Sequence, residues 1–338
     1  MKSRMGIATL LAAATAAFPA AAQERNVDLR VSFWINASHP IVNAITEWGK
    51  SIETASAGTI KVSTYPSEQL GKAIDHYDMV RDGIVEMAFV GPAYNAGRFP
   101  IWSNIEMPLT LKDPVAGAAA FREWYLPYAE KEMSDVKLCL VTMQPPGVFH
   151  TSKREIRSPS EVNGLKMRPG GALIGTWLSQ MGATVIPAPL PEIRQVLERG
   201  LIDGMTFTWD LFQISTENYA KFHLDYPMYT SAQAWPINIG FYNSLSEKQK
   251  SVIDGHCNGE WSSLVTKAWA DRESASREKL KASSDHVFTV PSDDDLKLWR
   301  DTLKPLETKL DGDLAAKSLD GAVLRGELAE VLSRHNAN

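Results

Sequence analysis

Residues Gly164–Gly204 read GLKMRPGGALIGTWLSQMGATVIPAPLPEIRQVLERGLIDG, and the fold prediction starts from this stretch. A short apolar run ends at a single arginine, Arg168, which Pro169-Gly170-Gly171 follows at once. A strand that delivers a guanidinium into a glycine-rich opening is suited to hold a carboxylate, because arginine offers a planar fork of donors and stays charged. The same pattern also fits an ion pair with an Asp or Glu of the protein. The spacing alone leaves both interpretations open.

Apolar residues on both sides of this stretch alternate between strand and helix periodicity. Strands are expected at 27–34, 60–64, 85–90, 136–143, 164–168, 184–187 and 205–209, and helices at 41–52, 74–81, 116–133, 173–181 and 192–199. This β-α-β-α-β order is typical of an α/β lobe with a mainly parallel sheet. A chain of 338 residues exceeds what one hydrophobic core usually supports, so we predict two lobes, the second beginning near Gly147.

The later part of the chain is predicted to be mostly helical. Ser246 to Gln249 form a capping box, S-x-x-Q, and no proline follows before Ser283. We expect either one helix of about 55 Å or two stacked helices, long enough to run along both lobes. The polar stretch 293–332 is also expected to be helical.

The first 22 residues have the pattern of a secretory signal peptide. Lys2 and Arg4 precede an apolar run, 6–18, that is too short to span a bilayer, and Ala20-Ala21-Ala22 offers a cleavage site. We therefore expect cleavage near Ala22, export to a periplasm and no membrane insertion of the mature chain. A formal net charge of −5 gives no reason to expect a nucleic-acid partner.

Nothing in the sequence has the pattern of an active site or a metal site. There is no G-x-S-x-G or H-E-x-x-H motif, and the seven histidines do not cluster at metal-ligand spacing. We predict that the chain is not an enzyme and needs no cofactor. Cys139 lies in an apolar strand-like run, far in sequence from Cys257, so we expect two free cysteines.

Aromatic side chains fall where a ligand would lie. Trp34 ends the first predicted strand, and Phe207 and Trp209 come at the end of the strand expected at 205–209. In α/β folds ligands bind at the carboxyl ends of strands, although each of these rings could equally be a core residue. With Arg168 they indicate a pocket with one cationic anchor and apolar walls.

Short motifs along the chain resemble, in order and spacing, the solute-binding proteins of tripartite ATP-independent periplasmic (TRAP) transporters, of the dicarboxylate-binding type. The matching pieces are His39-Pro40, 58–62 leading into 65–71, 80–88, Pro108-Leu109, 151–154, 164–168, 182–184, Glu192 and 200–204. Each motif is weak alone, and their common order over nearly the whole mature chain carries the resemblance.

The resemblance implies a two-lobed α/β periplasmic binding protein with a long helix spanning both lobes and the ligand in the cleft between them. Lobe I is expected to comprise 23–147 and 234–272, and lobe II 148–233 and 273–338. The resemblance also implies a carboxylate ligand and delivery to the small and large TRAP membrane subunits. We expect a monomer. Arg168 matches the carboxylate-binding arginine of the family.

Departures from the family pattern narrow the expected ligand. Val148 and Phe149 stand where polar-acid binders often carry a second arginine, and Phe207 stands where many carry an asparagine. Thr206 lacks the carboxylate with which some oxo-acid binders hold a metal, so no metal is expected. A second carboxylate would lack a partner there, which is costly. The candidate ligand contacts are Arg168, Phe207, Trp209, Trp34, Phe149, Gly171, Leu190, Val90 and Tyr94.

We therefore expect an aromatic or otherwise apolar monocarboxylate as the ligand. A C4-dicarboxylate or a sugar acid is the alternative within the family. A ligand-binding sensor that signals without transport is the alternative outside transport.

Overall fold

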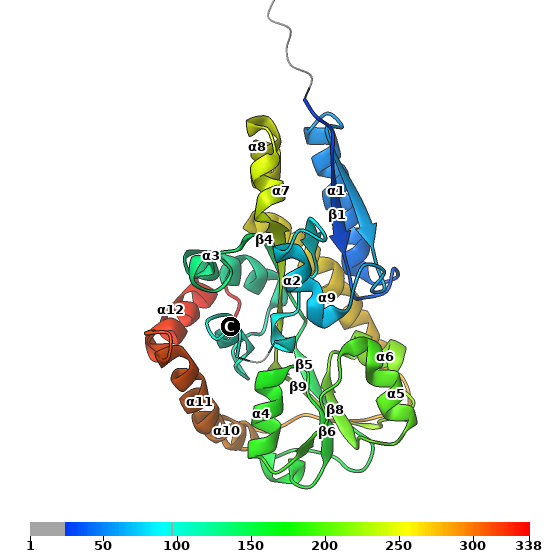
Figure 1. Ribbon diagram of the computed structural model, residues 1–338. Helices are drawn as coiled ribbons and strands as arrows, with labels where there is room; N and C mark the ends of the chain where they lie inside the picture. The colour runs from blue at the N-terminus through cyan, green and yellow to red at the C-terminus, as the bar shows by residue number, and fades with distance from the viewer. Residues whose placement is uncertain (1–23, 96) are drawn as a thin grey trace, which may run out of the picture.

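The computed structural model describes residues 24–95 and 97–338, and the predicted signal peptide (1–22) lies outside these residues. Two sheets with helices around them form two α/β halves, one above the other in Figure 1. Within the described part of the chain, no helix is both long and apolar enough to cross a membrane.

The first sheet has the strand order β2-β1-β3-β10-β4, with β1 parallel to β2 and β3, and β10 antiparallel to β3 and β4. Its strands are β1 (Val27–Ser32), β2 (Ile60–Tyr65), β3 (Met87–Ala88), β4 (Val136–Met143) and β10 (Ala232–Asn238). Helix α1 (Pro40–Ala55) starts where the His39-Pro40 pair predicts it, because proline suits the first helical position. Its apolar face, which includes Ile41, Ile45 and Trp48, is buried against this sheet.

The second sheet has the order β11-β9-β5-β8-β6-β7 and carries Arg168. Its strands are β5 (Gly147–Thr151), β6 (Lys166–Arg168), β7 (Thr184–Val185), β8 (Gly204–Phe207), β9 (Phe222–Tyr229) and β11 (Val287–Thr289). Strand β8 ends at Phe207, two residues earlier than predicted, because Trp209 already begins helix α6 (Trp209–Ser215).

The remaining helices lie around the two sheets. They are α2 (His76–Arg81), α3 (Pro114–Glu132), α4 (Ala172–Gln180), α5 (Ile193–Glu198), α7 (Ile239–Ser244), α8 (Glu247–His256), α9 (Gly259–Lys281), α10 (Asp293–Asp301), α11 (Leu303–Ala315) and α12 (Gly321–Arg334). Short 3-10 turns, η1 (Ala73–Asp75), η2 (Pro92–Tyr94), η3 (Trp102–Glu106), η4 (Pro159–Val162) and η5 (Leu190–Glu192), connect them.

Of the two arrangements expected for 246–283, two helices are present. The capping box at Ser246 starts α8 as predicted, and the chain breaks at Cys257 before α9. The 23 residues of α9 span about 35 Å. This helix packs on α1, α3 and β4 of the first half and on α6 of the second, so it spans both halves (Figure 1).

The C-terminal helices return to the first half of the molecule. Helices α10, α11 and α12 run along one side, from the second sheet toward α3 (Figure 1). Leu324, Leu328 and Leu332 of α12 are buried, and the amide of Lys112 donates to the carbonyl of Ala337. The predicted placement of 273–338 in lobe II therefore does not describe α12. The other lobe boundaries stay a prediction.

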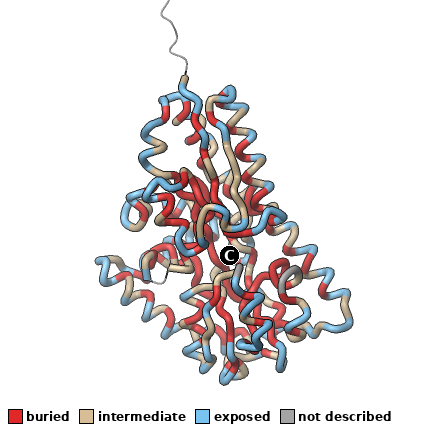
Figure 2. Tube along the Cα trace, turned by 45° about the vertical axis from the view of Figure 1, so that its right-hand side comes forward, coloured by how far each residue is buried: buried red, intermediate tan, exposed pale blue. Residues whose placement is uncertain are grey.

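Two short crossings join the halves between β4 and β5 and between β9 and β10. They pair with each other, since the Gln144 amide donates to the Ser231 carbonyl at 2.8 Å and the Thr230 hydroxyl donates to the Gln144 carbonyl at 2.7 Å. Buried segments follow both sheets and continue between the halves (Figure 2).

The prediction of two free cysteines is wrong, because Cys139 and Cys257 form a disulfide. Cys139 lies in the middle of β4, and Cys257 lies in the turn between α8 and α9 that packs over this strand. Arg122 donates to the carbonyl oxygens of both cysteines, which holds the turn on the strand. A separation of 118 residues hides this proximity in the sequence.

Reduction of this disulfide, or replacement of both cysteines by alanine, should lower the free energy of unfolding by about 2–5 kcal/mol, because the cross-link closes a long loop in the unfolded chain. Urea denaturation with and without reductant measures the loss. Thiol titration of the unreduced, unfolded protein is the check, and two titratable thiols would contradict the cross-link.

Candidate functional site

Arg168 is the last residue of β6 and lies inside the molecule. Its side chain is 2 % exposed, and its Nε donates to the Ala188 carbonyl at 2.9 Å. No Asp or Glu of the described residues forms an ion pair with it. The side chains that interact electrostatically with its guanidinium are the phenols of Tyr94 and Tyr229. The interpretation of Arg168 as half of an internal ion pair is therefore not supported.

The guanidinium of Arg168 is a buried cation with no anion of the described residues beside it. Burial lowers the pKa of Arg168 from its ordinary value, and the phenolic groups of Tyr94 and Tyr229 partly offset this effect. A buried charge without a charged partner is costly, and a ligand carboxylate can supply that partner. Helix α4 begins four residues later, and the positive end of its dipole favours an anion in the same region.

Phe207 lies beside the guanidinium. The Arg168 Cζ atom is 5.1 Å from the centroid of the Phe207 ring, which is within the range of cation–π contacts. Phe207 ends β8, the strand next to β6, and is 3 % exposed. The surface next to the cation is therefore apolar, and the role of Phe207 as a ligand contact stays a prediction.

Tyr229, which the sequence analysis did not select, ends β9, and its phenol interacts electrostatically with Arg168. Its hydroxyl is buried, without a partner in good hydrogen-bonding geometry, and lies near Thr206 and Gln144. The ring packs so closely on Gly147 and Gly170 that a Cβ atom on either glycine would overlap it. In the sequence, only Gly147 and Gly170 indicate a closely packed neighbour, and they do not identify it as Tyr229.

Two cavities lie between the halves and are lined by four of the predicted contacts. The first, of about 280 Å³, brings Trp34 and Leu190 together from opposite halves. The second, of about 630 Å³, brings Tyr94 and Gly171 together. Ala188, whose carbonyl accepts from Arg168, also lines the second cavity.

Aromatic contacts connect the two cavities. The Trp34 ring stacks on Phe89 at 5.0 Å and meets the edge of Tyr94 at 5.7 Å. The indole Nε1 of Trp34 is buried without a hydrogen-bond partner. A donor in this position can serve a polar group of a ligand.

Three predicted contacts lie elsewhere. Phe149 is fully buried against Trp177 and Trp299 because its side of β5 faces the core under α4 and α10. Trp209 starts α6, leaves the alternation of β8 and stacks on Phe288. Val90 is buried in a backbone bridge to Ala234, so these three residues do not line the two cavities. Arg168 and Phe207 are buried and do not line them either, although Ala188, which accepts from Arg168, borders the second cavity.

A chain of three histidines, which the sequence did not predict, leads from Phe207 outward. His150 Nε2 lies 3.3 Å from the Phe207 carbonyl, His150 Nδ1 lies 2.8 Å from His223 Nδ1, and His223 Nε2 lies 2.9 Å from His286 Nδ1. Burial lowers the pKa of His150 well below its ordinary value and that of His223 to about 3. In the described part of the chain, no group of His, Cys, Asp and Glu is arranged to hold a metal ion.

Comparison with known proteins agrees with the two-lobed fold. Residues 31–311 match the family model DctP, described as bacterial extracellular solute-binding protein, family 7. The outer membrane transporter protein TsaT of Comamonas testosteroni is 23% identical over 278 residues, which cover 80% of this chain and 82% of that protein.

Solved structures of TRAP solute-binding proteins superpose on the model. One, from a marine metagenome, is described as specific for aromatic acid ligands and holds 3-hydroxybenzoate. It is 27% identical with a TM-score of 0.85, and the match covers 92% of this chain and 99% of that one. Another, from Rhodoferax ferrireducens, holds copurified benzoate, is 24% identical with a TM-score of 0.85 and has the same coverage.

Replacement of Arg168 by methionine should change the free energy of unfolding of the ligand-free protein by less than about 1.5 kcal/mol. The lost bond to Ala188 is offset because an unpaired charge is no longer buried. Arg277→Met is the matched control, since Arg277 binds both oxygens of the buried Asp225. Urea denaturation should show the larger loss for the control, and a loss of about 3–5 kcal/mol for Arg168→Met would indicate a structural ion pair instead.

The stability contributed by His223 should depend on pH. Because burial lowers the pKa of His223 to about 3, below pH 6.5 the unfolded chain binds a proton that the folded protein does not. The neutral ring therefore stabilises fully above pH 6.5, and this contribution falls as the pH drops toward 3. Relative to His223→Gln, the wild type should lose about 2 kcal/mol in unfolding free energy between pH 7 and pH 5.

The difference in unfolding free energy between wild type and His223→Gln removes the opposing pH effect of Glu106. Burial raises the pKa of Glu106 to about 8 in both proteins. Denaturation curves of wild type and His223→Gln that shift in parallel with pH would show that His223 is not held neutral.

Proposed function

The chain belongs to bacterial extracellular solute-binding protein family 7, and from this premise we propose that it binds an aromatic or otherwise apolar monocarboxylate through Arg168. The family and the solved relatives are binding proteins that serve transport. In this proposal the ligand carboxylate takes the place of the missing anion beside the guanidinium, and the halves close over the rest of the ligand.

The observation that carries the proposal is the buried, unpaired guanidinium of Arg168 against the ring of Phe207. Arginine can accept one carboxylate in a bidentate manner. Phe207 lies against it, and the described residues that line the adjacent cavity, Tyr94 and Ala188 among them, include no Lys or Arg for another carboxylate. An apolar body with one acidic group therefore matches the site best.

The relative from the marine metagenome supports this ligand class, because it is described as specific for aromatic acid ligands. Its identity of 27% over 92% of this chain makes it a guide to the class of ligand and not to the compound. Benzoate, 3-hydroxybenzoate and mandelate are the first compounds to test.

A sugar acid is the second candidate, and the smaller cavity favours it. Asn36, Ser67 and Glu68 line this cavity from the first half, and the exposed Arg194 lines it from the second. These polar groups could bind hydroxyls, and Arg194 could bind a second carboxylate of a C4-dicarboxylate at the solvent-exposed rim.

We further propose that the protein works in the periplasm and delivers its ligand, as a monomer, to the small and large TRAP membrane subunits. The family assignment supports this role. A sensor role without transport is the alternative, and a transport assay with the membrane subunits distinguishes the two.

Thermal unfolding with a panel of acids tests the ligand class. An aromatic acid at 100 times its Kd should stabilise the protein by about 2.7 kcal/mol, since it binds only the folded state. Succinate and glucuronate, matched in concentration, are the controls. Stabilisation by either of them, with none by aromatic acids, would reverse the assignment.

Replacement of Arg168 by alanine should weaken binding of the best acid about 30-fold to several thousandfold, because a buried carboxylate without its partner costs about 2–5 kcal/mol. Isothermal titration calorimetry measures the loss, and Arg194→Ala, which lines the smaller cavity, is the control. A loss below threefold for Arg168→Ala would show that the anchor lies elsewhere.

A further inference from the structure

The two halves meet at an unusually small pair of residues. Gly171 precedes α4 with φ −173°, an extended conformation that any residue adopts. A Cβ atom on Gly171 would lie 2.9 Å from the Cβ atom of Ala93, closer than such atoms approach in proteins. The neighbour across the cleft, and not the backbone conformation, therefore requires glycine at this position.

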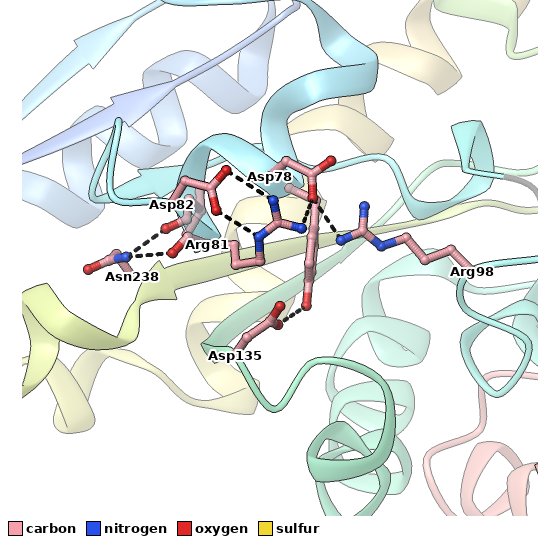
Figure 3. Close-up of polar contacts among 8 residues, drawn as sticks. Asp78, Arg81, Asp82, Arg98, Asp135 and Asn238 are labelled. Atoms are coloured by element: carbon pink, nitrogen blue, oxygen red, sulfur yellow. Dashed lines mark hydrogen bonds and ion pairs between the residues drawn. The ribbon is translucent and has the colours of Figure 1, made fainter.

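The Ala93 side of this contact is held firmly. Ala93 lies in η2, directly after Val90, which exchanges two backbone hydrogen bonds with Ala234 of β10 at 2.9 and 3.0 Å. Beyond η2, Arg98 donates to Asp78 at 2.8 Å (Figure 3) and lies 4.3 Å over the ring of Tyr77. The segment is therefore fixed on both sides of Ala93.

The attachment of Arg98 is itself part of a polar network on α2. Arg81 pairs with Asp78 and Asp82, and the Asn238 amide donates to the Arg81 carbonyl at 3.2 Å (Figure 3). Asp135 accepts from the hydroxyl of Tyr77 at 2.5 Å. These contacts tie α2, and with it Arg98, to the first sheet.

The Gly171 side is held equally well. The Gly170 amide donates to the Thr206 hydroxyl at 2.8 Å, and the Gly171 carbonyl accepts from the Gly175 amide at 2.9 Å. Tyr229 packs on Gly170 and leaves it no room to move inward. A larger side chain at Gly171 would therefore push the two halves apart.

The contact is narrow as well as rigid. Ala93 and Ala172 border both the cavity of about 630 Å³ and another of about 160 Å³. Open space thus lies on both sides of this contact between the halves. We propose that the contact between Gly171 and Ala93 is the stop that limits closure and so sets the width of the ligand cleft.

This inference rests on the proposed function, and it names two residues that determine which ligands fit. An added methyl group at Gly171 would hold the halves apart. A small acid such as benzoate would then lose contact with one wall, while a bulkier acid such as 2-naphthoate would still reach both. The contact therefore affects affinity according to ligand size, without touching the carboxylate.

Calorimetry with benzoate on the full mature chain tests the stop. Gly171→Ala should weaken binding about 5- to 150-fold, the range that overpacking of a tight contact gives, with a smaller loss for 2-naphthoate. The double variant Ala93→Gly/Gly171→Ala should return to within threefold of wild type, because the opposing Cβ atom is gone. Gly326→Ala, on a helix position with open space around it, is the control for the substitution itself.

Unchanged benzoate binding by Gly171→Ala, or failure of Ala93→Gly to restore it, would overturn the inference. An equal loss of affinity for benzoate and 2-naphthoate in Gly171→Ala would also overturn the inference.

A cross-linking experiment tests the contact without any aromatic acid. The double variant Ala93→Cys/Gly171→Cys should form a disulfide on oxidation, since its Cβ atoms, which would lie 2.9 Å apart at the contact, reach the spacing of about 3.8 Å that a disulfide needs after a small separation of the halves. Mass spectrometry of the digested, unreduced protein detects it beside the Cys139–Cys257 pair.

The two proposals fail in different ways. Absence of the cross-link, in a wild type that binds aromatic acids, overturns the stop and leaves the proposed function intact. Formation of the cross-link, with no aromatic acid bound by the wild type, supports the stop and overturns the ligand class.

Discussion

The buried guanidinium of Arg168 is the constraint on which the arrangement of the site depends. A cation without a charged partner in the interior is unfavourable, and the polar groups that the described residues bring to it are a carbonyl and two phenols. The surrounding structure must therefore hold it in place. Strands β7 and β8 flank β6, Ala188 fixes the Nε, and Tyr229 lies against the glycine that follows. In the proposed function, the carboxylate of the ligand supplies the missing anion.

The two halves are joined in a way that suits closure over such an anion. Two crossings, paired through Gln144, Thr230 and Ser231, provide a short connection, and α9 spans both halves alongside it. The disulfide fixes the start of α9 to β4, so the helix is anchored on the first half. At the mouth of the cleft, in contrast, the halves meet through residues as small as Gly171 and Ala93, with cavities beside them.

Features that depend on neighbouring residues in the chain were predictable. The starts of α1 and α8 follow from His39-Pro40 and from the capping box at Ser246, since both signals act within one helical turn. Strand β6 ends at Arg168 as predicted. Tyr229, the histidine chain and the disulfide were not predictable, because each joins segments far apart in sequence. The return of α12 to α3 was missed for the same reason, since an amphipathic helix does not reveal which apolar surface will cover it.

The order of residues along the chain was enough to predict the alternation of strands and helices, the family and one arginine at a strand end followed by glycines. These properties depend on periodicity, capping and motif order, which are local or additive along the chain. The packing of the two halves was needed to show that no Asp or Glu of the described residues pairs with Arg168, that Trp34 and Leu190 line one cavity from opposite halves, and that Phe149 and Trp209 lie away from the two cavities between the halves. Whether an arginine binds a protein carboxylate or awaits a ligand depends on which side chains surround it in space, and that depends on how the two halves pack.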